Sequence, residues 1–213
     1  MISLASRTLP HVTTIDGPDG KTRCGWVGRD AEYIRYHDEE WGVPLHGDRP
    51  LFEKLTLEGF QSGLSWITIL RRRPTFRSAF DDFDPAVVAG YSPDDIARLM
   101  ADTGIIRNRA KIEATIANAA ALLALQSEEG EGALDRLIWS FAPPPRPETD
   151  RPRELGDIAS TSAESVTLSK ELRRRGFRFI GPTTAYALMQ SGGLVDDHLV
   201  SCFRAGSGAV TAR

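Results

Sequence analysis

The chain has 213 residues, of which 26% are charged and 41% hydrophobic, and it carries a net charge of −3 with two cysteines. These values are ordinary for a globular protein with its own core, and they exclude a long disordered chain and a disulfide-stapled scaffold. The acidic balance also argues against a uniformly basic surface for nucleic acid, although it permits a local basic face.

The first 22 residues lack the long apolar stretch and basic flank of a signal peptide, so we expect a loose, flexible N-terminal extension. Two cysteines without a disulfide framework fit a reducing compartment. We therefore expect a cytoplasmic protein with no membrane span. The pattern that follows predicts a helical domain over residues 23–203 and a frayed tail over residues 204–213.

Apolar residues recur at spacings of three and four nearly everywhere, which predicts an all-α fold. The first amphipathic segment runs from Leu51 to Leu70 and should break near Gly59 or Gly63. Ser92 and Pro93 are typical of a helix start. Further helices are expected over residues 93–102, 107–126, 131–141, 160–175, 183–191 and 194–203, and no stretch alternates as a strand should.

A proline-rich stretch, residues 142–157, interrupts the helical pattern. Proline lacks an N–H donor and clashes inside a helix, so this stretch should form an extended linker between two lobes. Any ligand shared by residues before and after it would tie the two lobes together.

Each of the two cysteines has a histidine near it in the sequence. His198 and Cys202 would lie one turn apart on a helix, whereas Cys24 and His37 need a turn between them. Two thiolates and two imidazoles fill a tetrahedral zinc shell, and a filled shell is structural because no position remains for water or substrate. The alternative is two buried cysteines and two ordinary histidines, and the spacing alone leaves both interpretations open.

The segment from Arg175 to Ala185 indicates two helices joined by a glycine hairpin. Gly176 can end the first helix in the left-handed conformation, and Gly181 with Pro182 can open the second. The free backbone amides at that second helix start suit a phosphate, as in a helix–hairpin–helix DNA clamp, while an ordinary αα-corner is the alternative. The arginine runs at residues 71–73 and 173–175 are typical of solvated helix ends.

Glu58 and Trp66 frame small residues within an apolar segment. A lone glutamate is usually exposed and a lone tryptophan usually belongs to the core. However, four more aromatic residues cluster near Cys24 and His37, namely Trp26, Tyr33, Tyr36 and Trp41. Aromatic faces around one buried carboxylate suit a flipped, electron-poor nucleobase, because the rings stack on it and the carboxylate pairs with its amine or its positive charge.

Four stretches, in this order, resemble the type I 3-methyladenine DNA glycosylases: RCGWVGRDAEYIRYHDEEWGVP, LEGFQSGLSWITILRRR, GIIRNRAKI and LSKELRRRGFRFIGPTTAYALMQSGGLVDDHLVSC. The similarity runs from about Arg23 to Cys202. It implies a helix–hairpin–helix DNA glycosylase architecture that acts as a monomer on alkylated double-stranded DNA and releases 3-methyladenine.

The resemblance also implies roles for single residues. Structural zinc would be held by Cys24, His37, His198 and Cys202, joining the N- and C-terminal segments. The base pocket falls on Glu58, as the catalytic residue, with walls formed by Trp26, Tyr33, Tyr36, Trp41 and Trp66. The DNA-binding residues would be Leu64, Ile180, Gly181, Pro182, Thr183 and Thr184. Among these, Leu64 would fill the gap left by the extruded nucleotide.

A 3-methylated adenine carries positive charge and leaves easily, so the enzyme mainly has to unstack it, hold it and stabilise the sugar cation. Asp197 is a candidate for that last task, or it could orient the adjacent His198. No lysine lies between Glu171 and Cys202, which predicts a monofunctional glycosylase that leaves an intact abasic site. The competing interpretations are a DNA-binding module without chemistry and a zinc hydrolase, which would need an open metal position.

Overall fold

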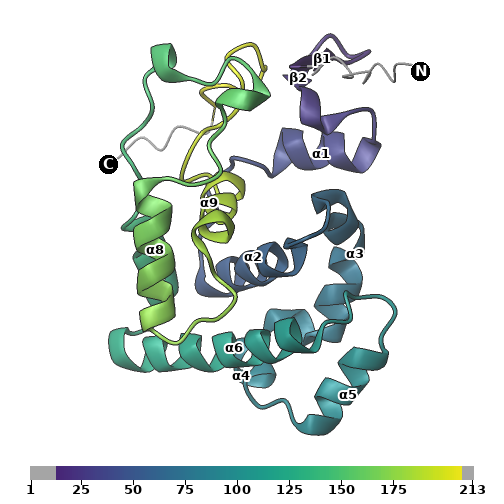
Figure 1. Ribbon diagram of the computed structural model, residues 1–213, viewed down its shortest axis with the longest axis vertical. Coiled ribbons are helices and arrows are strands. Elements are labelled where there is room, and N and C mark those ends of the chain that lie inside the picture. Colours follow the sequence, from purple (N-terminus) through teal and green to yellow (C-terminus); the bar gives the residue numbers. More distant parts are fainter. Residues whose placement is uncertain (1–12, 208–213) are drawn as a thin grey trace, which may run out of the picture.

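The computed structural model describes residues 13–207, and most of them lie in helices (Figure 1). The α-helices within this range are α1 (Ala31–Glu39), α2 (Asp48–Gln61), α3 (Trp66–Ala79), α4 (Pro85–Val88), α5 (Pro93–Ala101), α6 (Arg109–Glu129), α7 (Ala133–Trp139), α8 (Ala163–Arg174) and α9 (Pro182–Ser191). Short 3₁₀ helices are η1 (Gly25–Val27), η2 (Asp81–Phe83), η3 (Glu148–Asp150) and η4 (Leu155–Asp157). None of the helices in the described part of the chain is long and apolar enough to cross a membrane.

Most helices lie where the apolar periodicity predicts them. The long segment beginning at Leu51 breaks after Gln61, at Gly63, whose φ of +84° is a left-handed conformation that glycine adopts without strain. Ser92 forms a capping box at the start of α5. Helix α1 was not predicted, because its short stretch is rich in charged residues and has few aliphatic ones.

The expected helix over residues 194–203 is wrong. The amides of Leu194 and Val195 both donate to the carbonyl of Met189, 2.8 and 3.2 Å away, which closes the end of α9. Beyond this point side chains bind the backbone, since Asp196 Oδ1 accepts from the His198 amide at 3.1 Å. The Leu199 amide donates to Cys24 Sγ at 3.4 Å and the Val200 amide to the Pro152 carbonyl at 2.9 Å, so distant groups also take hydrogen bonds that a helix would have used.

The expectation of no strands is also wrong. Strands β1 (Thr14–Asp16) and β2 (Thr22–Cys24) form an antiparallel hairpin in which Thr14 faces Cys24. Part of the expected N-terminal extension, residues 13–22, therefore has regular structure, whereas residues 1–12 lie outside the described residues. The hairpin lies beside the C-terminal segment (Figure 1), and the amide of Phe203 donates to the carbonyl of Thr22 at 2.9 Å.

Helix α2 passes through the middle of the molecule and packs against α3, α6, α7 and α9 (Figure 1). It is buried along most of its length, so it lacks a solvent-facing polar side. One hydrophobic cluster includes Leu51 of α2 as well as Leu168 and Leu172 of α8. The residues before and after the proline-rich linker therefore share one core, and the linker runs over its surface with only 3₁₀ turns.

Asp48 ties the start of α2 to two later helices. Its carboxylate accepts from the Gln126 side chain at 2.7 Å and from the Gly132 and Asp135 amides at 3.0 and 2.9 Å. We expect Asp48→Asn to lower the free energy of unfolding by about 2–3 kcal/mol, because an amide nitrogen would then face backbone donors in a buried site. Urea denaturation measures this loss.

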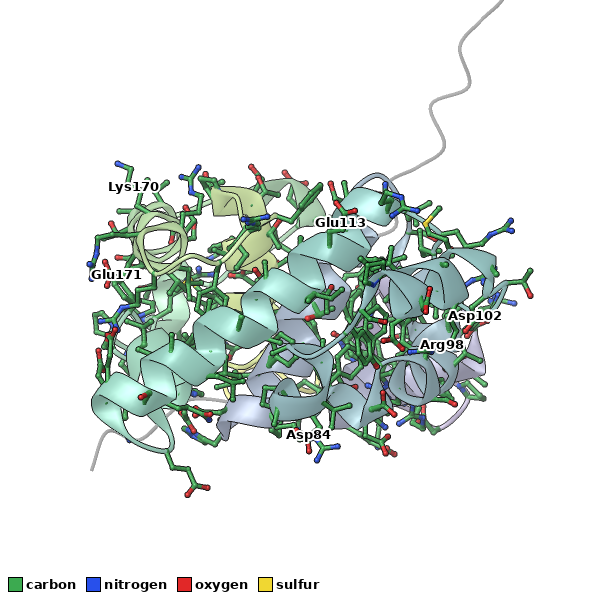
Figure 2. All side chains as sticks on the ribbon, turned by 90° about the horizontal axis from the view of Figure 1, so that it is seen from below. Asp84, Arg98, Asp102, Glu113, Lys170 and Glu171 are labelled. Atoms are coloured by element: carbon green, nitrogen blue, oxygen red, sulfur yellow. The ribbon has the colours of Figure 1, made fainter. Side chains whose placement is uncertain are left out.

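The matched control is Glu113→Gln, the same carboxyl-to-amide exchange on the exposed face of α6 (Figure 2). This change should alter the stability by no more than about 0.5 kcal/mol. Equal effects of the two exchanges would contradict the assigned role of Asp48.

Candidate active site and metal centre

Glu58 and the five aromatic residues expected around it line one cavity of about 230 Å³. They come from separate elements: Trp26 from η1, Tyr33 and Tyr36 from α1, and Glu58 from α2. Trp41 follows α1, and Trp66 is the first residue of α3. The fold thus brings together every residue that the sequence assigned to the base pocket.

The Glu58 side chain is only 5% exposed although it carries a carboxyl group. Ser191 of α9 donates a hydrogen bond of 2.8 Å to its Oε1 atom. Burial raises the pKa of Glu58, while the charge of Lys54 and the Ser191 hydrogen bond lower it. The cavity therefore holds a carboxyl group that lacks the hydration it would have in water.

The aromatic rings form two connected groups around this carboxyl. Trp26 makes edge contacts with Tyr33 and Trp41, with ring centroids 5.3 and 5.2 Å apart. Tyr36 and Trp66 lie 5.4 Å apart with their planes tilted by 43°. The indole Nε1 of Trp66 is buried and has no acceptor among the described residues.

Lys54 is a buried cation that the sequence did not point to. It stands one helical turn before Glu58 on α2, and its amine lies 5.1 Å from the ring centre of Tyr36 and 5.3 Å from that of Trp66. Burial lowers the pKa of Lys54, while Glu58 and Glu40 raise it. Burial and the charge of Glu58 raise the pKa of Tyr36 well above its usual value. The charge of Lys54 therefore acts on the two aromatic rings, Tyr36 and Trp66, that lie beside Glu58.

The cavity is also lined by five residues that the sequence did not assign to it: Gln61, Ile158, Ala187, Gln190 and Ser191. Ile158 lies directly after the proline-rich linker and before the next predicted helix. No sequence pattern there indicated that it would line the cavity. Ser191 and Gln190 lie at the end of α9, and the helical periodicity would have placed them there without showing which face meets Glu58.

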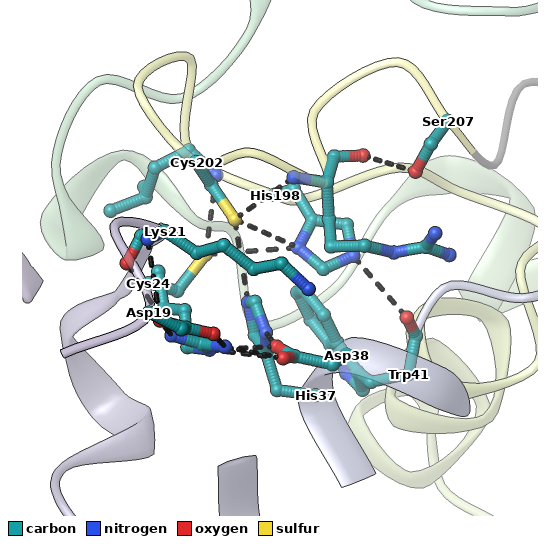
Figure 3. Close-up of polar contacts among 12 residues, drawn as sticks. Asp19, Lys21, Cys24, His37, Asp38, Trp41, His198, Cys202 and Ser207 are labelled. Atoms are coloured by element: carbon teal, nitrogen blue, oxygen red, sulfur yellow. Dashed lines mark hydrogen bonds and ion pairs between the residues drawn. The ribbon is translucent and has the colours of Figure 1, made fainter. Parts of the chain in front are cut away.

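The two cysteines and two histidines meet at a second, buried cluster (Figure 3). Their ligand atoms all lie within 4.8 Å of one another. Cys202 Sγ lies 3.4 Å from His37 Nε2 and 3.6 Å from His198 Nδ1, and Cys24 Sγ lies 3.8 Å from His198 Nδ1. All four side chains are buried, so the cluster could hold a metal ion without an open position for water.

Each imidazole in this cluster is held by its other nitrogen. His37 Nδ1 contacts Asp38 Oδ1 at 2.8 Å, and the guanidinium of Arg23 in turn donates to Asp38. His198 Nε2 lies 3.2 Å from the carbonyl of Trp41. Such outer contacts fix the ring orientation of metal-binding histidines and leave one nitrogen of each ring facing the ligand site.

Asp197 does not contact the His198 side chain, which the sequence suggested it could orient. Its buried carboxylate accepts from Tyr186 and Gln190 at 2.8 Å each and lies 2.7 Å from Arg146. The orientation of His198 comes instead from the Trp41 carbonyl. Asp197 is therefore connected to the base cavity through Gln190 and not to the metal cluster through His198.

The expected hairpin is present between α8 and α9. Gly176 ends α8 with a φ of +94°, and Gly181 and Pro182 open α9, as the sequence predicts. Ile180 is buried, so its side chain belongs to the core, whereas Thr183 is exposed. Thr184 is half-buried, and Leu64 is exposed in the loop between α2 and α3.

A larger cavity of about 580 Å³ lies beneath the linker. The two arginines that line it form ion pairs within the protein, Arg146 with Asp197 and Arg151 with Asp196, so their charges are already balanced. The smaller cavity around Glu58 combines a buried carboxyl with aromatic walls, and chemistry rather than size makes it the candidate site.

A protein-family model described as methyladenine glycosylase matches residues 26–205. This chain belongs to the methyladenine glycosylase family. DNA-3-methyladenine glycosylase 1 of Escherichia coli is 47% identical over 180 residues, covering 84% of this chain and 95% of the relative. A DNA-3-methyladenine glycosylase of Haemophilus influenzae is 50% identical over 181 residues, covering 85% and 96%.

Solved structures from the methyladenine glycosylase family share the fold. A crystal structure of 3-methyladenine DNA glycosylase I superposes with a TM-score of 0.80 at 45% identity, covering 85% of this chain and 98% of the other. A Tyr-to-Phe variant of 3-methyladenine DNA glycosylase I in complex with 3-methyladenine gives a TM-score of 0.79 at 33% identity, covering 86% and 97%.

The raised pKa of Glu58 predicts how stability changes with pH. Between the unfolded and the folded pKa, the folded protein binds more protons, so ionisation of Glu58 lowers stability as the pH rises. Glutamine does not titrate. We therefore expect the stability of Glu58→Gln relative to the wild type to increase as the pH rises from about 4 to 7. Urea denaturation at several pH values tests this.

The control Glu113→Gln should show no such trend, because that carboxyl is exposed. A relative stability of Glu58→Gln that decreases with rising pH would mean that Lys54 and Ser191 outweigh the burial of the carboxylate.

Proposed function

We propose that this chain removes 3-methyladenine from alkylated DNA by hydrolysing its N-glycosidic bond, the first step of base-excision repair. The observation that carries this proposal is the buried carboxyl of Glu58 inside an aromatic cavity. Membership of the methyladenine glycosylase family supports it, as do the relatives named DNA-3-methyladenine glycosylase and the structure of a 3-methyladenine complex.

The electrostatics of the cavity favour a cationic base over a neutral one. An ionised carboxylate in an apolar cavity is costly, and a positively charged ring stacked between aromatic walls offsets that cost. Neutral adenine offers no net charge in return. Glu58 thus acts as the residue that recognises the methylated base, with Tyr36 and Trp66 as walls.

The reaction itself needs little activation of the leaving group. The bond between N9 of the base and C1′ of the sugar breaks, and its electron pair cancels the positive charge of the base. Water then adds to C1′ and releases a proton, which leaves an abasic site. Lys111 donates to two backbone carbonyls, and from Glu171 to Cys202 the chain has no lysine for a Schiff base, which supports monofunctional hydrolysis.

Access to the base requires a flipped nucleotide. In this proposal the amides that open α9, at Thr183 and Thr184 behind Gly181 and Pro182, bind the DNA backbone. Exposed Leu64 fills the gap in the duplex. The Ile180 side chain anchors the hairpin in the core, because it is buried.

We also propose that the cysteine–histidine cluster binds zinc as a structural ion. Zinc bonds of about 2.3 Å to sulfur and 2.0 Å to nitrogen place tetrahedral donor atoms roughly 3.3–3.8 Å apart, and the three cluster distances of 3.4, 3.6 and 3.8 Å fit this range. Four protein donors leave no site for substrate, so Cys24, His37, His198 and Cys202 hold the ion and the ion holds the two chain ends together.

Replacing Glu58 tests the proposed function. We expect Glu58→Gln to reduce the single-turnover rate of 3-methyladenine release from methylated duplex DNA by about 100-fold, because the neutral amide does not offset the positive charge of the base. Release is measured by separating the free base from the DNA. The same samples, run without alkali, should show an unbroken DNA strand.

The control is again Glu113→Gln, which should keep wild-type rates. Equal rates for Glu58→Gln and the wild type would overturn the site assignment. A wild-type protein that binds abasic DNA and releases no methylated base would instead favour a DNA-binding module.

Removal of zinc should loosen the fold. We expect one zinc ion per chain by elemental analysis, and a chelator or a His37→Ala change should lower the melting temperature by roughly 10 °C or more, since metal-binding energy is folding energy. Restored zinc should restore the melting temperature of the wild type and not of His37→Ala. Loss of base release at an unchanged melting temperature would contradict a structural role.

A further inference from the structure

Two segments that the proposed function places on DNA are far apart in the sequence but are fastened to one helix. These are the α2–α3 loop (residues 62–65), which carries Leu64, and the hairpin (residues 176–181), which leads directly into the amides that open α9. Helix α6 runs across the underside of the molecule (Figure 2), and two of its buried polar side chains contact these segments. The proposed mechanism leaves both side chains, Lys111 and Asn118, without a role.

Lys111 fastens the α2–α3 loop. Its amine donates to the carbonyl of Phe60 and to that of Ser62, each at 2.9 Å, and only 8% of the residue is exposed. These carbonyls belong to the last turn of α2 and to the residue after it, where the helix dipole is negative and carbonyl groups lack helical partners. The ammonium group thereby fixes the direction in which the chain leaves α2, two residues before Leu64.

Asn118 fastens the hairpin. Its Oδ1 accepts from the Arg178 amide at 2.6 Å, and its Nδ2 donates to the Arg178 carbonyl at 3.1 Å. The next residue, Phe179, has a φ of +58°, a strained value for a residue with a side chain. Its carbonyl lies against Gly59 of α2, where an added Cβ atom would stand 4.0 Å from it. The hairpin backbone is thus hydrogen-bonded to α6 and packed against α2.

Lys111 and Asn118 are seven residues apart, two turns of α6, so both point from the same face. Together with Gly59, Phe60 and Arg178 they surround a gap of only about 10 Å³. Side chains this closely packed do not shift independently. The separation between the α2–α3 loop and the hairpin is therefore set by the length of α6 between the two side chains.

We propose that Lys111 and Asn118 are positioning residues that hold Leu64 and the hairpin at the spacing needed to engage DNA together. The inference rests on the proposed function. Without Lys111, the α2–α3 loop would have to be ordered during DNA binding, which costs backbone conformational entropy. The cavity around Glu58 contains neither side chain, so binding of the free base should be largely independent of them.

The test compares Lys111→Met and Asn118→Leu with the wild type. We expect each change to lower the single-turnover rate of base release from methylated duplex DNA at least about tenfold. The dissociation constant of free 3-methyladenine, followed by quenching of the cavity tryptophans, should change less than about threefold. Lys170→Met, the same exchange at an exposed site on α8 (Figure 2), should leave both quantities unchanged.

A double-mutant cycle shows whether Lys111 acts through Leu64. If it does, Lys111→Met should lower the rate less than about threefold in a Leu64→Ala background, whereas Asn118→Leu should keep its full effect there. Where Asn118→Leu fails to fold, Asn118→Asp replaces it, because the carboxylate still accepts from the Arg178 amide but repels the Arg178 carbonyl.

The outcomes separate this inference from the function on which it rests. A wild-type protein that releases no 3-methyladenine contradicts the proposed function itself. An active wild type with folded variants that retain full rates on DNA overturns the positioning role. Parallel losses in free-base binding and in DNA-dependent release also overturn it, since they indicate general damage to the fold.

Discussion

The burial of the Glu58 carboxyl inside the protein core is the constraint on which the rest of the site depends. An uncompensated charge there would be very costly, so the neighbouring elements each supply a partner. Helix α9 provides the Ser191 hydroxyl, and α2 itself provides the charge of Lys54. Helices α1 and α3 provide the rings of Tyr36 and Trp66 over the Lys54 amine. A carboxyl held in this way is poised for a cationic ligand.

The cysteine–histidine cluster and the aromatic cavity are parts of one structure. Tyr36 and His37 are neighbours on α1, and one faces the cavity while the other faces the cluster. Trp41 lines the cavity with its ring and receives the contact from His198 through its carbonyl. A metal that fixes the two histidines therefore also fixes the aromatic walls. The geometry of the cluster and the shape of the cavity are therefore coupled through α1 and Trp41.

Sequence patterns predicted these sites unevenly, for physical reasons. The four residues of the cluster could be grouped because cysteine and histidine are scarce in this chain, and the helices could be placed because their burial is periodic. Lys54 was missed because lysine is usually exposed, and only tertiary packing shows that this one is buried. The helix expected at residues 194–203 failed because its backbone bonds side chains, including Cys24 Sγ at 3.4 Å from the Leu199 amide. No local propensity reports a partner so distant in the sequence.

Buried polar residues are concentrated in a few parts of the core. Asp48 joins helices, but most of the others lie at one of three places: Lys54, Glu58, Ser191 and Asp197 around the cavity, Arg23 and the two histidines at the cluster, and Lys111 and Asn118 beneath the α2–α3 loop and the hairpin. Apolar residues at these positions would pack at lower cost. The polar side chains instead orient their neighbours. A hydrogen bond fixes the position and direction of a backbone carbonyl or a ring, whereas van der Waals packing is not directional. The core thus gives up some stability, and in return the cavity around Glu58, the cysteine–histidine cluster and the two segments bound by α6 keep one fixed geometry.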